Sequence, residues 1–176
     1  YTINGAKDMS FNNGLGYMQE GSSVIKQGNT QSPVATIYDM RMLNGKVVIA
    51  GAFQYYDEAY FTMRMYPNGQ WDNTFGNNGR CVHPVTFEVP TNDLTNAQVL
   101  QDGSSVFYSI LRYWGQGVGG ADSSVLSCVK NTVAGIPDAS FGSAGVLTFS
   151  YLSPQYPIFI FKSDNSALFA YFRRYG

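Results

Sequence analysis

The sequence is poor in charge and has no long apolar run. Only 13% of its 176 residues are Asp, Glu, Lys or Arg, about half the usual share, and the net charge is −1. A chain without a basic excess lacks the positive face that nucleic acids require, so no nucleic-acid partner is expected. No run approaches the ~18 apolar residues of a spanning helix, so we do not expect the chain to span a membrane.

The residues that usually carry catalysis are also scarce. His83 is the only histidine, which excludes a zinc site built on two or three imidazoles, and we interpret it as a hydrogen-bonded strand residue. Asp57 and Glu58 form the only adjacent carboxylate pair and are interpreted as solvated loop charges. Residues 115–120 match G-x-G-x-x-G, but no helix follows them, which favours a loop over a dinucleotide site. We therefore expect no catalytic residue, no metal and no cofactor.

Two cysteines, Cys81 and Cys128, have no CxxC spacing. We predict two buried thiols, because free cysteine is among the most buried residue types; a single disulfide between neighbouring repeats is the alternative. The sequence begins at Tyr1 rather than Met, which indicates a processed product or part of a longer chain or complex.

Strand patterns fill most of the chain. Glycine is frequent (19 residues), turn dipeptides recur every ten residues or so, and no segment has a helical apolar period. Alternating and β-branched segments predict strands at 37–43, 46–51, 60–66 and 80–87, with Asn44-Gly45 as a hairpin turn. The same order predicts strands at 96–101, 104–109, 124–130 and 146–149, followed by a hairpin of 157–162 and 167–172.

One short signature occurs three times, with Asp, then Ser or Thr two residues later, then Phe. Its Asp stands at 8, 72 and 138, at intervals of 64 and 66 residues, which indicates a repeat architecture. We expect the Asp to cap a turn rather than bind calcium, the Phe to be a buried anchor and the glycines to permit close backbone approach. The signature residues are Asp8, Phe11, Asp72, Phe75, Gly76, Gly79, Asp138, Phe141, Gly142 and Gly145.

Four strands in a unit of roughly 60 residues is the pattern of a propeller blade. We predict an all-β fold of β-propeller-like repeats, each a four-stranded antiparallel blade, with too few blades to close a ring. Residues 1–31 are expected to form the end of a preceding blade and a linker, 32–89 and 90–153 two blades, and 154–176 the start of a following blade.

The segments Asn44–Gly51, Phe61–Gly69 and Asp72–Gly79 resemble the delta-60 repeat of bacterial secreted and surface proteins. The similarity is good over 35–82 and looser over 94–149, where Arg64 has no clear counterpart. The resemblance implies a propeller-like fold, a bacterial source and an extracellular or outer-surface location. It also implies, for some members, export as cargo of a type IX secretion system, and it brings no catalytic residue.

Aromatic residues gather in the loops between the second and third strands of each unit. The expected patch consists of Phe53, Tyr55, Tyr56, Tyr113 and Trp114. Tyr and Trp suit both glycan stacking and protein contact. The sequence thus predicts a non-catalytic surface module that contacts a protein or a glycan, for example in adhesion. The alternative is a secreted glycan-active hydrolase, which needs two carboxylates about 5–10 Å apart.

Overall fold

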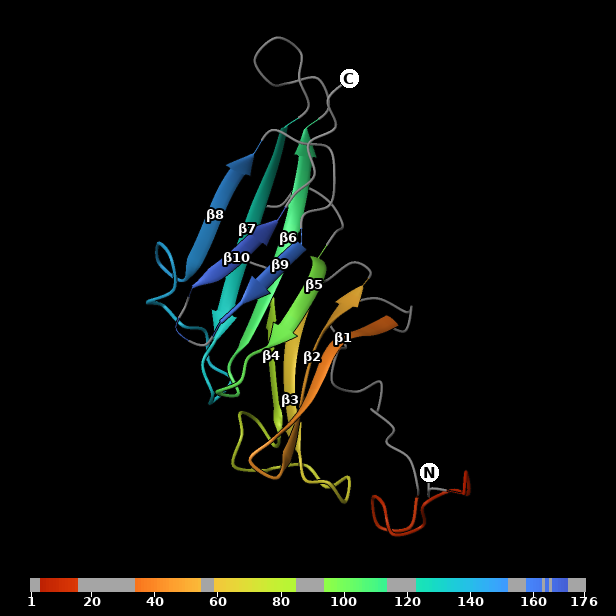
Figure 1. Ribbon diagram of the computed structural model, residues 1–176. Helices are drawn as coiled ribbons and strands as arrows, with labels where there is room; N and C mark the ends of the chain where they lie inside the picture. Colours follow the sequence, from red (N-terminus) through yellow and green to blue (C-terminus); the bar gives the residue numbers. More distant parts are fainter. Residues whose placement is uncertain are drawn as a thin grey trace, which may run out of the picture. The chain divides into compact units, whose positions relative to one another are not determined.

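The chain divides into two compact units, residues 1–85 and 86–176 (Figure 1). The computed structural model describes residues 4–15, 34–54, 59–84, 94–113, 123–151, 158–162, 164 and 166–170. Within these ranges the chain forms strands and turns and no helix, which confirms the all-β prediction. Accordingly, no segment in these ranges makes a helix that is long and apolar enough to cross a membrane.

The first unit contains a four-stranded antiparallel sheet with the order β1-β2-β3-β4. Its strands are β1 (Val34–Leu43), β2 (Lys46–Gln54), β3 (Ala59–Met65) and β4 (Arg80–Pro84). Asn44 and Gly45 join β1 to β2 with φ angles of 50° and 72°, as the predicted two-residue turn requires. β4 is described as far as Pro84, which pairs with Ala59; the rest of the predicted strand, 85–87, lies outside the described residues.

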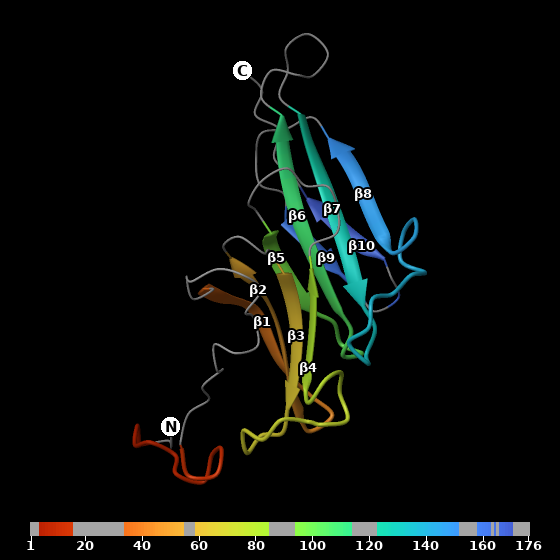
Figure 2. The ribbon, with the colours of Figure 1, turned by 180° about the vertical axis from the view of Figure 1, so that it is seen from behind.

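The second unit contains a four-stranded antiparallel sheet with the order β5-β6-β7-β8 and a hairpin. The sheet is formed by β5 (Leu94–Val99), β6 (Ser105–Tyr113), β7 (Ser123–Asn131) and β8 (Val146–Tyr151). The hairpin pairs β9 (Ile158–Phe161) with β10 (Ala167–Ala170). Figures 1 and 2, viewed from opposite sides, show this hairpin on one face of the sheet.

Both sheets have a β-bulge at the same place in their first strand. The register shifts just before Asp39 in β1 and just before Asn96 in β5. In each case the side-chain oxygen accepts the N–H of the next residue, at 2.9 Å from Met40 and 2.8 Å from Ala97. The bulges were not predicted from the sequence. The extra residue in β1 shifts the alternation of faces by one and so places Ile37 on the same face as Met40 and Met42.

The apolar core of the first unit lies mainly on one face of its two central strands. Phe53 and Phe61 stack there with ring centroids 4.6 Å apart, in a tilted arrangement. The cluster consists of Ile49, Phe53, Ala59, Phe61, Met63 and Met65, flanked by Phe11, Val47, Trp71 and Val82.

The core of the second unit includes a residue of the hairpin. Phe161 of β9 packs against Tyr108 of β6, with ring centroids 5.9 Å apart. The cluster consists of Leu100, Val106, Tyr108, Leu126, Cys128, Phe141 and Phe161, with Leu147 against it. The hairpin is therefore held by the same apolar contacts that close the sheet's own core.

Candidate functional site

The aspartates of the signature close turns in the same way throughout the described residues. In five Asp-x-Ser/Thr motifs, one carboxylate oxygen accepts both the backbone N–H and the hydroxyl of the Ser or Thr two residues later. The N···O distances are 2.9–3.1 Å and the O···O distances 2.5–2.6 Å. The motifs begin at Asp8, Asp72, Asp102, Asp138 and Asp164. Capping by a side chain was predicted for the three signature positions; the two hairpin positions, 102 and 164, share it.

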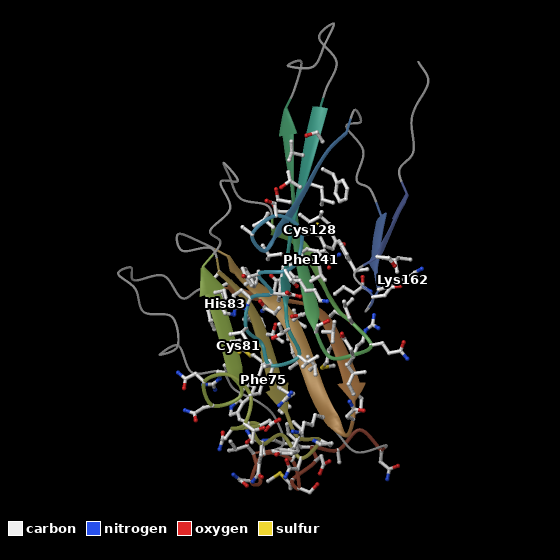
Figure 3. All side chains as sticks on the ribbon, turned by 90° about the vertical axis from the view of Figure 1, so that its left-hand side faces the viewer. Phe75, Cys81, His83, Cys128, Phe141 and Lys162 are labelled. Carbon is white, nitrogen blue, oxygen red and sulfur yellow. The ribbon has the colours of Figure 1, made fainter. Side chains whose placement is uncertain are left out.

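The backbone around Asp72 and Asp138 is also bonded alike. The N–H of Asp72 donates to the carbonyl of Arg64 at 3.0 Å, and that of Asp138 donates to Lys130 at 2.8 Å. The N–H of each signature Phe donates to the carbonyl of its Asp, at 2.9 Å for Phe75 and 3.0 Å for Phe141. Both phenylalanines are buried, as predicted (Figure 3).

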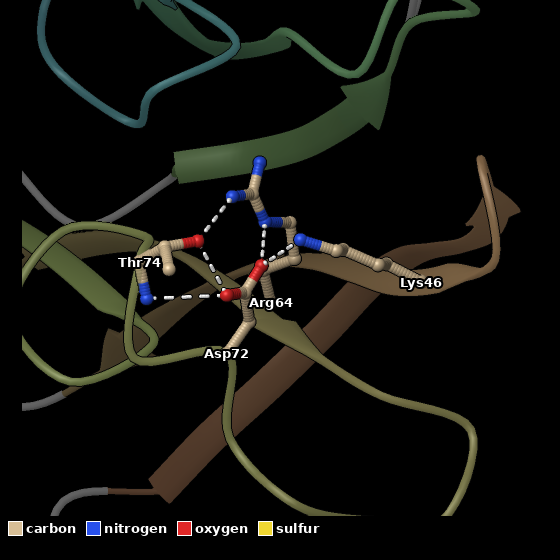
Figure 4. A network of polar contacts seen from close by, with 4 residues as sticks. All are labelled: Lys46, Arg64, Asp72 and Thr74. Carbon is tan, nitrogen blue, oxygen red and sulfur yellow. Dashed lines mark hydrogen bonds and ion pairs between the residues drawn. The ribbon is translucent and has the colours of Figure 1, made fainter.

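Asp72 is the centre of a charged cluster (Figure 4). Its side chain is fully buried, and one oxygen accepts from Thr74. The other oxygen receives Nζ of Lys46 at 2.6 Å and Nε of Arg64 at 2.7 Å. Four donors thus occupy the sites that a carboxylate offers. The guanidinium of Arg64 also lies over the ring of Phe75, 4.5 Å from its centroid, which joins the charged cluster to the buried anchor.

The surroundings fix Asp72 as an anion. Burial alone would raise the pKa of Asp72, but the hydrogen bonds from Lys46, Thr74 and Arg64 outweigh burial and hold the pKa well below its usual range. A general acid or base works best with a pKa near the working pH. This carboxylate is therefore suited to fixing a turn against the sheet and not to transferring protons.

Lys130 takes the place of Arg64 in the second sheet, eight residues before its Asp. The pairings Val48–Arg64 and Val106–Lys130 place both cations opposite a valine of the second strand. Its Nζ lies 3.9 Å from Asp138, so this ion pair is looser than those of Asp72. Arg64 therefore has a counterpart in the second unit, Lys130, although none was predicted from the sequence. The common spacing of eight residues between the cation and its Asp is the sequence signal that indicates it.

The first signature, at residues 4–15, packs on the first sheet's unit. The N–H of Asn12 donates to the carbonyl of Asn68 at 2.6 Å, and Gln70 donates to the side chain of Asn13 at 3.0 Å. Phe11 lies against Gly69, where a Cβ would meet its ring at 2.6 Å. The first signature thus places its Phe11 against the Asn68-Gly69 turn of the sheet that follows it in the chain.

The predicted aromatic patch is described only in part. Tyr55, Tyr56 and Trp114 lie outside the described residues, and Tyr113 ends β6 with its side chain outside them. Phe53 is 4% exposed and belongs to the apolar core, so it offers no contact surface. In the sequence, Tyr55 and Tyr56 fall between β2 and β3, and Trp114 falls between β6 and β7.

His83 and the two cysteines have structural surroundings, whereas Asp57, Glu58 and residues 115–120 lie outside the described residues. His83 lies in β4 with its ring 5.3 Å from that of Tyr60. Cys81 and Cys128 are buried thiols, as predicted, and burial raises the pKa of both, for Cys128 to about 12. Within the described ranges, no three His, Cys, Asp or Glu side chains gather as they would around a metal ion.

Comparison of the chain with protein-family models, with curated proteins and with solved structures finds no significant match.

Proposed function

We propose that this chain is a non-catalytic, bacterial, extracellular repeat module of the delta-60 type, whose four-stranded sheets are blades of a β-propeller-like assembly. Its role in this proposal is contact with another protein or a glycan at the cell surface or during export by a type IX secretion system. Among the described residues, the most buried carboxylate, Asp72, is saturated by Lys46, Arg64 and Thr74, which favours a contact role over a catalytic one.

The observation that carries the proposal is the shared construction of the two sheets. Each has four strands in chain order, a bulge in its first strand, and a cation eight residues before a capping Asp. Stacked modules of this kind bury their faces against neighbours and present loops of one type along one edge. A module that repeats its scaffold and varies its loops is suited to binding.

The contact surface in this proposal is the pair of loops between the second and third strands. By sequence position, Tyr55 and Tyr56 belong to the first connection and Trp114 to the second, directly after Tyr113 at the end of β6. Such side chains offer rigid, amphipathic contact area at low entropic cost. Phe53 does not belong to this surface, because its ring packs in the core of the first unit.

The test is a double variant, Tyr56→Ala with Trp114→Ala, compared with Ile136→Ala as an exposed apolar control outside these loops. Binding is measured on an array of bacterial and host glycans and by pull-down of outer-membrane proteins, and each variant's melting temperature is recorded. We expect at least a tenfold loss of binding with nearly unchanged melting, the result of removing about 1.4 kcal/mol or more of contact. A large fall in melting temperature for the double variant contradicts the proposal, because it assigns these side chains to the core. Release of reducing sugar that one carboxylate substitution abolishes would favour the hydrolase instead.

A further inference from the structure

The outer strand β1 carries an exposed apolar stripe. Met40 and Met42 are 61% and 59% exposed, and Ile37 is 58% exposed. Met40 pairs with Ile49 and Met42 with Val47, so the stripe lies on the sheet face that holds the first unit's core. An apolar core face that continues onto an exposed edge strand is typical of a contact surface.

The hairpin β9–β10 shows what covers this position elsewhere in the molecule. Phe161 is the last residue of β9 before the hairpin turn and pairs with Ala167. Met42 holds the matching position in β1, because it directly precedes the last pair before the turn and itself pairs with Val47. Phe161 is only 4% exposed, because it packs into the core of the β5–β8 sheet.

A side chain of that sheet also binds the backbone of β9. Gln98 Nε2 donates to the carbonyl of Phe161 at 3.1 Å, and the N–H of Phe161 donates to Gln98 Oε1 at 3.1 Å. Those two backbone groups point away from β10. Met42 likewise stands one residue before the last pair of its ladder, Leu43 with Lys46.

The other face of β9 has an apolar residue at the position that Gln98 holds in β5. Ile160 directly precedes Phe161 and pairs with Leu168. In the same way, Gln98 directly precedes Val99 and pairs with Val106. The side chain of Ile160 is 47% exposed. Met42 thus holds in β1 the position that Phe161 holds in β9, and Ile160 holds in β9 the position that Gln98 holds in β5. The net charge of −1 gives two copies little mutual repulsion.

We propose that copies of this chain associate head to tail, with the β1 stripe of one copy packed on the Ile160 face of β9–β10 in the next copy. The two surfaces differ, so the contact is heterologous and propagates from copy to copy instead of closing a two-fold dimer. This surface lies on strands, apart in sequence from the aromatic loops, and its failure would leave the glycan or protein contact proposed above untouched.

Sedimentation velocity of the full chain, from low to high micromolar concentration, tests the proposal. We expect the weight-average sedimentation coefficient of the wild type to rise with concentration. Met40→Glu with Met42→Glu, and separately Ile160→Glu, should weaken association by about tenfold or more, since each places a charge in an apolar contact. The matched control is Ile136→Glu, because Ile136 is 60% exposed in a turn outside both surfaces and should leave association unchanged.

Mixing the variants identifies the kind of contact. The β1 variant keeps its hairpin face and Ile160→Glu keeps its β1 stripe, so an equimolar mixture should form one-to-one heterodimers although each variant alone stays monomeric. Circular dichroism melts confirm that each variant is folded, and the two variants lie in different units, so each tests the contact on its own. A wild type that stays monomeric throughout, an equal effect of Ile136→Glu, or variants that fail to pair in the mixture would each overturn the proposal.

Discussion

At Asp72, four donors converge on one buried carboxylate, and the turn around it depends on the charge. Asp72→Asn should lower the free energy of unfolding by about 3–5 kcal/mol, because it leaves Lys46 and Arg64 facing a neutral amide. Asp138→Asn is the matched control and should cost less, about 1–2 kcal/mol, since its ion pair is longer and its side chain more exposed. Urea unfolding at pH 7 measures both, and an equal loss in the two variants would contradict the ranking.

The pH dependence of stability follows from the same carboxylate. The pKa of Asp72 in the folded chain lies below its ordinary value of 3.8, so the folded state binds the proton more weakly than the unfolded state. Its stabilisation is therefore complete above the unfolded pKa and is lost as the pH falls through about 4 toward the folded pKa. Urea unfolding across this acid range should show a steeper loss for the wild type than for Asp72→Asn; parallel curves would refute the assignment.

Gly76 tests the backbone of the signature. Its φ is +51°, and a Cβ there would overlap Sγ of Cys81 and the carbonyl oxygen of Arg80. Gly76→Val should therefore cost about 2–5 kcal/mol, from left-handed strain and overpacking together. Gly103→Ala is the control, because Gly103 also has a positive φ but has nothing within 4 Å of its Cβ, so only the strain of about 1–2 kcal/mol remains. Thermal melts that rank Gly103→Ala as the more destabilised would contradict this account.

Single residues of the signature were predictable where the chemistry is local. Asp72 as a cap, Phe75 as an anchor and the positive φ at Gly76 all follow from a few neighbouring letters. Lys46 as a partner of Asp72 was not predicted, because a separation of 26 residues becomes a contact only through the register of the sheet.

Among the elements, the β9–β10 hairpin is hydrogen-bonded to one side chain of another strand, Gln98 of β5. Gln98→Leu removes both hydrogen bonds to Phe161 while keeping a similar volume, so the amide of Phe161 should exchange with solvent faster by about tenfold. Gln98→Glu keeps the acceptor for the Phe161 N–H and should show a smaller effect. Hydrogen exchange resolved at single residues is the measurement. Unchanged protection of Phe161 in Gln98→Leu would show that apolar packing alone holds the hairpin.

Strand positions were predictable from alternation and turn dipeptides, but their details were not. The Asn44-Gly45 turn has the backbone that its sequence requires. The bulges before Asp39 and Asn96 carry no sequence signal, because Asp and Asn are also ordinary surface residues. β6 extends to Tyr113 and so takes in a residue that was assigned to a loop.

For the whole molecule, each unit carries one buried cysteine, so the two thiols report separately on the two units. Both should react with a thiol reagent only after unfolding, since burial raises the pKa of each and keeps the thiolate scarce. Mass spectrometry of peptides after brief labelling in rising urea assigns a midpoint to Cys81 and another to Cys128. Fast labelling in native buffer, or a mass two hydrogens low without reductant, would contradict the buried-thiol assignment.

The similarity of the two units was visible in the sequence, whereas the surfaces on them were not. The interval of 66 residues between Asp72 and Asp138 can be read from the sequence without a structure. The exposure of Met40 and Met42 could not be predicted, because a methionine in an alternating strand is typical of a core position. These side chains are exposed because β1 is an edge strand of its sheet.

The order of the strands has a consequence for how the chain is made. In both four-stranded sheets every strand pairs with the strand that precedes it, so each new pairing joins segments that are close in sequence. Loop-closure entropy is then small at each step, and contact order is low for an all-β protein. A chain leaving the ribosome can complete β1–β2 before β3 exists, and β1–β4 before the second unit has been synthesised. Slow pairing between distant strands, which exposes many β proteins to aggregation, is thereby absent from both sheets.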